Sequence, residues 1–165
     1  QGKPLTIDTN LQNAFSQLLN DEQADASLLA EALTLPSELF IAEQVEVIDV
    51  DAIHQARDFL RVTLAKNLQD IWLAQYLKFS AEKTYALDSI SIGQRRLKNI
   101  ALDYLLALNN QTSRDLALKQ FNQADNMTDK MGAMKPILSA NCKEAETVLQ
   151  LFQEQYRNDA LVMDK

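Results

Sequence analysis

The scarcity of turn residues is the feature that most limits how this chain can fold. The 165 residues include only three glycines and three prolines, which are Gly2, Gly93, Gly132, Pro4, Pro36 and Pro136. A β-sandwich or β-barrel joins many short strands and usually needs more turn residues than that. Long stretches without them favour helices, so we expect an all-α protein with essentially no β-structure.

Apolar residues recur every three or four positions in most of these stretches, as they do on the buried face of a helix. Three shorter helices are predicted at 9–19, 26–33 and 37–42. The stretch 50–79 predicts one long helix, or two helices that meet near Lys66 and Asn67. The clearest stripe ends at a turn formed by Asn109 and Asn110, and its members are Leu97, Ile100, Ala101, Tyr104, Leu105 and Leu108.

Several side chains suit helix starts, where they can accept hydrogen bonds from the first free backbone amides. Asp49 suits this N-cap position before residue 50. Later pairs with capping-box spacing are Thr112 with Asp115, Asn126 with Asp129, and Asn141 with Glu144. The second pair opens a helix with the apolar stripe Met127, Met131, Met134 and Leu138. Pro136 lies inside that helix, where a proline costs about 3 kcal/mol, so we expect a kink or an end there.

The predicted helices have similar lengths and short links, so sequence neighbours should be antiparallel. Seven or eight of them favour an α-solenoid, a HEAT- or armadillo-like superhelix of antiparallel helix pairs. No strict sequence period is visible, and a closed bundle is the alternative. The length and the apolar content of 47% indicate a single helical domain over residues 1–165.

The charge balance argues against two classes of partner. Lysine and arginine total 16 against 23 aspartates and glutamates, which gives a net charge of −7. Such a chain repels phosphate backbones and anionic lipids, so we expect no nucleic-acid and no membrane partner. Cys142 is the only cysteine, which excludes an intrachain disulfide and fits a reducing, cytoplasmic location.

Few residues could carry chemistry. His54 is the only histidine, whereas a zinc site needs three protein ligands. Cys142 has no nearby base that would activate its thiol. Arg95, Arg96 and Lys98 fit a solvated helix face opposite the apolar stripe. The residues therefore predict no catalytic, cofactor-binding or metal-binding side chain in this chain.

Three strings in the second half of the chain resemble a known family. They are, in order, Lys119-Gln120-Phe121, Asn126-Met127-Thr128-Asp129 and Leu161-Val162-Met163-Asp164-Lys165. Together they resemble the C-terminal helical domain of bacterial aminopeptidase N, a zinc metallo-aminopeptidase of the gluzincin class. The likeness spans most of the chain and is strongest over 91–165. It is weaker at Leu35-Pro36-Ser37 and around Ile48-Asp49.

The resemblance implies that the chain is a fragment of a larger multidomain enzyme. That parent would release N-terminal residues from peptides, using zinc held by a His-Glu-x-x-His motif and a further Glu in an upstream domain. The helical domain would be a non-catalytic cap that closes over the catalytic domain and restricts substrate access. The expected partners are that catalytic domain and the peptide substrates, and zinc is expected in the parent but not in this fragment.

The resemblance transfers no site residue to this chain. Gly132-Ala133-Met134 matches the start of the family's Gly-Ala-Met-Glu-Asn motif, which binds the substrate's amino terminus. Lys135 and Pro136 follow instead of Glu-Asn, so the match is interpreted as chance. The family's chamber-facing arginine motifs would lie beyond Lys165. The alternative function is a free-standing helical-repeat interaction module related to the enzyme by ancestry alone.

The end of the chain carries a further expectation. Both ends resemble cuts, and the last residues resemble the start of another helix. Each unit of a solenoid buries its apolar stripe only against its neighbours. We therefore expect the face around Val148, Phe152 and Tyr156 to be partly uncovered and to promote self-association through this end.

Overall fold

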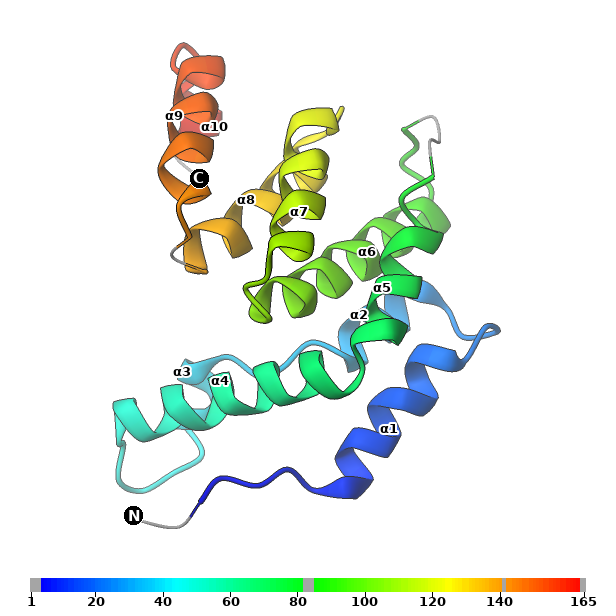
Figure 1. Ribbon diagram of the computed structural model, residues 1–165, viewed down its shortest axis with the longest axis vertical. Coiled ribbons are helices and arrows are strands. Elements are labelled where there is room, and N and C mark those ends of the chain that lie inside the picture. Colours follow the sequence, from blue (N-terminus) through cyan, green and yellow to red (C-terminus); the bar gives the residue numbers. More distant parts are fainter. Residues whose placement is uncertain (1–3, 82–84, 141, 164–165) are drawn as a thin grey trace.

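The computed structural model describes residues 4–81, 85–140 and 142–163, which form ten helices and no strand (Figure 1). The helices are α1 (Thr9–Asn20), α2 (Ala26–Ala32), α3 (Glu38–Ala42), α4 (Val50–Asn67), α5 (Gln69–Lys78), α6 (Ser89–Ala107), α7 (Gln111–Gln123), α8 (Met127–Ser139), α9 (Glu144–Tyr156) and α10 (Ala160–Met163). The all-α prediction is confirmed. The helices number ten rather than seven or eight, partly because residues 50–79 divide and a short α10 follows α9.

Helix α6 is the centre of the arrangement. It packs against α2, α4 and α5, which precede it, and against α7 and α8, which follow it. Beyond α6 the contacts join successive helices, α7 with α8, α8 with α9, and α9 with α10. In Figure 1, α6 crosses the middle of the molecule, with α1, α3 and α4 below it and α7, α9 and α10 above it. This stacking of neighbours is the predicted arrangement of an α-solenoid.

An aromatic cluster holds the first half of the fold to α6. Trp72 stacks on Tyr104 with ring centroids 4.1 Å apart, and Phe15 meets Tyr104 edge-on. The indole Nε1 of Trp72 donates to the Leu64 carbonyl at 3.3 Å, and the Tyr104 hydroxyl donates to the Leu33 carbonyl at 3.0 Å. Burial raises the pKa of the Tyr104 hydroxyl, so it remains a hydrogen-bond donor at any ordinary pH.

Gly93 allows α2 to approach α6 closely. A Cβ atom at this position would lie 2.5 Å from the Oγ and 2.8 Å from the backbone nitrogen of Ser27. A side chain can turn away from such a clash, whereas a backbone nitrogen moves only if the helix moves. The close packing of α2 on α6 therefore requires glycine at position 93.

Two of the predicted helix starts are confirmed. Asp49 caps α4, because its carboxylate accepts a hydrogen bond from the backbone N–H of Ala52 at 3.0 Å. Asn126 caps α8 by accepting from the backbone N–H of Asp129 at 2.9 Å. Both bonds satisfy amides that a helix leaves without internal partners.

Of the other two predicted starts, the one at Thr112 is wrong and the one at Asn141 is not tested. The prediction at Thr112 is wrong by two residues, because α7 is capped by Asn110, which accepts from the Ser113 backbone N–H at 2.9 Å. Asn109, just before it, takes a left-handed conformation with φ of 47°, which asparagine tolerates better than most residues. Helix α9 begins after Lys143, which makes no capping bond with its side chain. The predicted cap for α9, Asn141, lies outside the described residues.

The two expected helix breaks differ in outcome. Residues 50–79 do form two helices, and they meet at Leu68, one residue beyond the predicted Lys66–Asn67 position. Pro136 does not end α8, which continues to Ser139. The proline removes one backbone hydrogen-bond donor. Because Pro136 lies only three residues before the end of α8, a distortion there affects few of the helix's residues.

The expected open face at the end of the chain is wrong for Val148 and Phe152, and of the three residues named only Tyr156 is partly exposed. Val148 is completely buried and Phe152 is 5% exposed, while Tyr156 is half-buried against the Phe152 ring at 4.8 Å between centroids. Helix α9 packs against both α8 and α10, and these neighbours cover the stripe. The large apolar side chains that remain exposed here are Leu149, Leu151, Leu161 and Met163.

Candidate functional site

Two of the three strings that carry the family resemblance, at 119–121 and 126–129, meet where α6, α7 and α8 join. Asp129, in the first turn of α8, accepts from Lys98 Nζ at 2.6 Å through Oδ2 and from Asn99 Nδ2 at 3.1 Å through Oδ1. The amide of Asn126 donates to Asp129 Oδ2 at 3.2 Å. One buried carboxylate therefore ties the start of α8 to the middle of α6, and its lone pairs are used by three donors.

Gln120 extends this joint to α7. Its Nε2 donates to Asn99 Oδ1 at 2.7 Å and to the backbone carbonyl of Asp129 at 2.9 Å. The side chain is buried, and its Oε1 has no hydrogen-bond partner within the described part of the chain. A buried network of this kind fixes the relative position of the helices it joins. Gln120 and Asp129, which belong to two of the family strings, thus have a structural role, because they hold three helices together.

Lys130 is the next residue and is buried without a carboxylate partner among the described residues. Its Nζ donates to Gln155 Oε1 at 2.7 Å and lies 5.0 Å from the Phe121 ring centroid and 5.6 Å from that of Tyr156. Burial lowers the pKa of this ammonium group. The side chain packs α8 against α7 through the Phe121 ring, and against α9 through the Tyr156 ring and the Gln155 amide.

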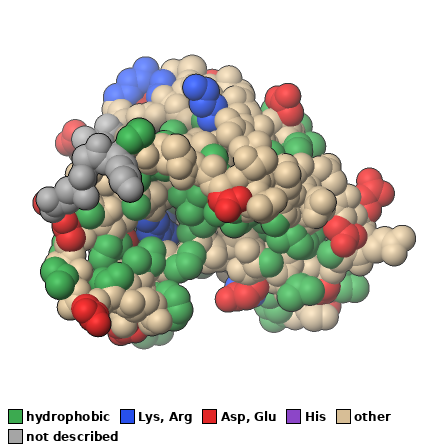
Figure 2. All heavy atoms as spheres, turned by 90° about the horizontal axis from the view of Figure 1, so that it is seen from below, with side chains coloured by type: hydrophobic (Ala, Val, Ile, Leu, Met, Phe, Trp, Pro, Cys, Tyr) green, Lys and Arg blue, Asp and Glu red, His purple; other side chains and the backbone are tan. Residues whose placement is uncertain are grey.

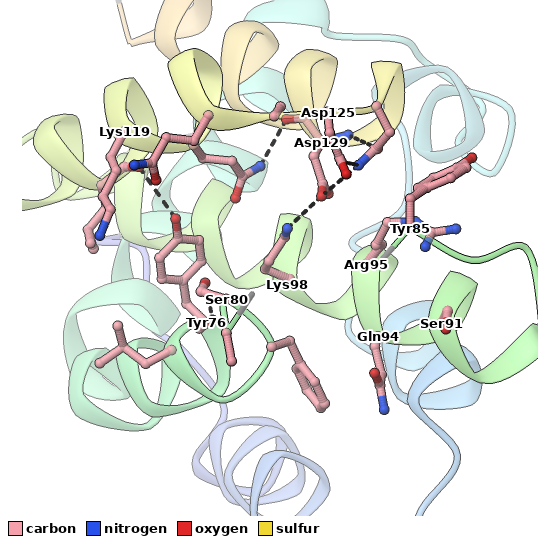
Figure 3. A pocket seen from close by; sticks show the side chains of 18 residues that line it. Tyr76, Ser80, Tyr85, Ser91, Gln94, Arg95, Lys98, Lys119, Asp125 and Asp129 are labelled. Atoms are coloured by element: carbon pink, nitrogen blue, oxygen red, sulfur yellow. Dashed lines mark hydrogen bonds and ion pairs between the residues drawn. The ribbon is translucent and has the colours of Figure 1, made fainter. Parts of the chain in front are cut away.

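A cavity of about 550 Å³ opens beside the joint, between α5, α6 and α7 (Figure 3). Its charged lining residues are Arg95, Lys98, Lys119, Asp125 and Asp129. Lys98 is paired with Asp129, as described above. Arg95 donates to the Ala86 carbonyl at 2.8 Å and lies over the Tyr85 ring. Of the three cationic lining residues, Arg95 and Lys98 therefore have partners within the chain.

The hydroxyl groups of this cavity show no arrangement for nucleophilic catalysis. Ser80 Oγ donates to the Tyr76 carbonyl at 2.5 Å, and Ser91 Oγ donates to Asp88 at 2.7 Å. The described lining residues include no histidine that could act as a base beside a serine. The geometry supports a structural joint with an adjoining polar cavity.

His54 lies far from this joint in the sequence, on α4, and is exposed. Its Nδ1 is 2.8 Å from Glu38 Oε1 of α3. Across the described residues, no three His, Cys, Asp or Glu side chains come together in a way that could hold a metal ion. In the same residues, no helix has the length and apolar character needed to cross a membrane. The prediction that the chain has no site residue is not tested by these observations.

The expected solvated basic face of α6 is wrong for one of its three members. Lys98 is 9% exposed and belongs to the Asp129 joint. Arg95 is half-buried against Tyr85, and only Arg96 is paired on the open surface, with Glu31 at 2.7 Å. The three side chains have three different partners, which are Asp129 for Lys98, the Ala86 carbonyl for Arg95 and Glu31 for Arg96.

The other residues singled out from the sequence are packing residues. Gly132, Ala133 and Met134 lie in α8, where Ala133 and Met134 are buried and a Cβ on Gly132 would collide with the Asn99 side chain. Cys142 is half-buried with Sγ 3.6 Å from the Ile137 carbonyl. None of these four residues lines the cavity.

Sequence reasoning identified Asn126 and Asp129 as a helix start but missed their main role. The sequence does contain one indication of this role. Three polar residues, Lys98, Asn99 and Gln120, occupy positions where α6 and α7 should be buried. A buried polar residue requires a partner, and Asp129 supplies one for each of them. The partners could not be assigned without the fold, because they lie 9 to 31 residues apart in sequence.

Comparison with known proteins agrees with this architecture. Residues 1–165 match the family described as "Domain of unknown function (DUF3458_C) ARM repeats". The chain is 35% identical over 165 residues to aminopeptidase N of Escherichia coli and 33% identical over 165 residues to that of Haemophilus influenzae. The alignment includes 100% of this chain but only 19% of either relative, so the chain spans about a fifth of their length.

A solved structure supports the fold independently. A crystal structure of Legionella pneumophila aminopeptidase A in complex with aspartic acid superimposes with a TM-score of 0.84 at 24% identity, over 98% of this chain and 20% of that one. The expected resemblance to the C-terminal region of aminopeptidase N is confirmed by these matches. The chain belongs to the DUF3458_C family of ARM-repeat domains.

Proposed function

We propose that this chain is the non-catalytic helical domain of a larger bacterial zinc aminopeptidase, which releases N-terminal residues from peptides in the cytoplasm. The observation that carries the proposal is the alignment of the whole chain with about a fifth of each aminopeptidase N relative. The remainder of such a polypeptide has room for a catalytic domain. The chain itself contributes a rigid stack of helices.

The residues of this chain do not fit a zinc site of their own. Catalytic zinc needs three protein ligands and an open position for water. The sequence has one histidine, and its Nδ1 is engaged with Glu38 on an exposed surface. Zinc is therefore proposed for the rest of the parent polypeptide, and no chemical step is assigned to residues 1–165.

The role proposed for the helical stack is to close over the catalytic domain and restrict which substrates enter. A solenoid suits this role because its shape is set by repeated helix-to-helix contacts. The Asp129 joint fixes α6, α7 and α8 at one such set of contacts. Loosening the joint should let larger substrates reach the catalytic domain without changing the chemistry there.

The test compares two substrates in the full-length polypeptide. Hydrolysis rates are measured for alanyl p-nitroanilide and for a long unfolded polypeptide that begins with alanine. Asp129→Ala should raise the rate on the long substrate relative to the anilide, while Glu31→Ala, which breaks an exposed ion pair, should leave the ratio unchanged. An unchanged ratio in Asp129→Ala, with the fold retained by circular dichroism, would contradict the access role.

A further inference from the structure

The surface formed by α3, the loop after it and the start of α4 exposes an unusual concentration of large apolar side chains. These are Leu39 at 71% exposure, Phe40 at 54%, Val45 at 43%, Val47 at 83%, Ile48 at 59% and Val50 at 67%. Single exposed apolar residues are normal on a protein surface, whereas a contiguous group marks a binding surface. Six within twelve residues form such a group.

The exposed group borders an apolar groove of about 460 Å³ between the α3 segment and α4. Its lining includes Leu35, Ile41, Val45, Val47, Ile53 and Leu60. In the view from below, hydrophobic side chains gather at the side of the molecule where Figure 1 places α3 and the start of α4 (Figure 2).

The two charged residues that line the groove already have partners within the chain. Asp49 caps α4 through Ala52, and Arg57 Nε donates to the Pro36 carbonyl at 2.7 Å. The remaining lining residues are apolar. The groove therefore suits the apolar side chains of a partner and offers little to a polar small molecule.

The border of the groove is acidic. Residues 38–51 contain Glu38, Glu43, Glu46, Asp49 and Asp51, and no lysine or arginine occurs between positions 4 and 56. A partner that presents lysine or arginine around an apolar centre would match this border. A second copy of this chain would bring two acidic borders together, which costs free energy.

We propose that the α3–α4 groove is the docking site for another domain of the same full-length polypeptide, which inserts apolar side chains and surrounds them with lysine or arginine. This inference rests on the proposed function, because that function supplies the second domain. The aminopeptidase N relatives are about five times as long as this chain, which covers 19% of each. A domain on the same chain is present at a high effective concentration, so a groove of this size can remain occupied.

A zero-length carbodiimide cross-linker tests the partner directly, because it joins a carboxylate only to an amine in contact with it. The monomeric full-length polypeptide is cross-linked, digested and analysed by mass spectrometry. We expect the peptide with residues 43–51 to be joined to lysines of the same polypeptide outside residues 1–165. Links from this peptide only between two copies, or only to lysines within residues 1–165, would overturn the proposal.

Cysteine labelling in the full-length polypeptide tests whether the groove is covered. Val47→Cys and Leu28→Cys replace apolar residues that are 83% and 65% exposed in this chain, and neither change should disturb the core. Each maleimide labelling rate is divided by its rate in denaturant. We expect Val47→Cys to label at least about tenfold more slowly than Leu28→Cys, as a contact of roughly 1.4 kcal/mol would produce. Equal relative rates would overturn the proposal.

These results separate the inference from the proposed function. Cross-links and labelling report a contact between domains and do not require peptidase activity. A full-length polypeptide that hydrolyses anilides but leaves Val47→Cys open would refute the docking site alone. A covered groove in a polypeptide without peptidase activity would refute the proposed function alone.

Discussion

Asp129 should be much harder to replace than Lys98, although the two form one ion pair. Their side chains are 10% and 11% exposed, and Nζ lies 2.6 Å from Oδ2. In Asp129→Ala the Lys98 ammonium group has no other carboxylate partner among the described residues. An unpaired buried charge of this kind costs about 3–5 kcal/mol.

In Lys98→Met the buried carboxylate keeps two donors, the side-chain amides of Asn99 and Asn126. Each hydrogen bond to a charged group contributes about 1.5–3 kcal/mol, so we expect Lys98→Met to cost only about 1–2 kcal/mol. The methionine also keeps most of the lysine stem packed. The prediction is therefore an asymmetry of at least about 1 kcal/mol between the two partners of one ion pair.

Urea unfolding measures the free energy of unfolding of the wild type, Asp129→Ala and Lys98→Met. Trp72 is the only tryptophan and is fully buried, so its fluorescence reports unfolding. Glu31→Ala is the control, because its ion pair with Arg96 is exposed and should contribute at most about 1 kcal/mol. Equal losses in Asp129→Ala and Lys98→Met, with unchanged m-values, would refute the reasoning that the amides hold Asp129 in place.

Three further predictions concern other contacts. Gly93→Ala should cost about 1–3 kcal/mol by pushing α2 from α6, and a thermal melt no lower than wild type would contradict the clash with Ser27. Lys130 has a lowered pKa in the folded state, whereas an unperturbed lysine has a pKa of 10.5. Between these two pKa values the unfolded chain binds more protons than the folded chain, so the free energy of unfolding of the wild type should rise with pH there. Unfolding titrations of Lys130→Met should lack this rise, and an unaltered rise in the variant would show that another group causes it. Tyr104→Phe should cost about 1 kcal/mol through loss of the hydrogen bond to Leu33 while keeping the ring stack, and a neutral effect in urea unfolding would contradict that bond.

The helices could be read from the sequence because their signals are local. Apolar spacing and caps such as Asp49 and Asn126 act within a few residues, and the predicted starts of the first three helices agree with the structure within one residue. The error at Thr112 has a local cause as well, since Asn110 offers an equivalent cap two residues earlier.

The contacts that join the helices could not be read in this way. Trp72 and Tyr104 were placed on apolar stripes, but their stacking depends on how α5 crosses α6. Lys98 was assigned to a solvated face because its charge suggested exposure, whereas its carboxylate partner lies 31 residues later. Burial of a charge depends on a partner that local patterns do not reveal.

The error at the end of the chain has the same origin. The stripe of Val148 and Phe152 was correct, but its neighbours were thought to be missing. Contacts with α8 and the short α10 cover it. Phe152→Ser is therefore expected to destabilise the fold by about 3–5 kcal/mol rather than to weaken self-association.

The most direct test of the proposed function compares the metal content and activity of this chain with those of the full-length polypeptide. Both are purified, zinc is measured by mass spectrometry, and hydrolysis of alanyl and leucyl anilides is followed with and without a chelator. We predict stoichiometric zinc and chelator-sensitive hydrolysis in the full-length polypeptide, and neither in the 165-residue chain. Zinc-dependent turnover by the chain alone, or a full-length polypeptide with no zinc and no turnover, would contradict the account.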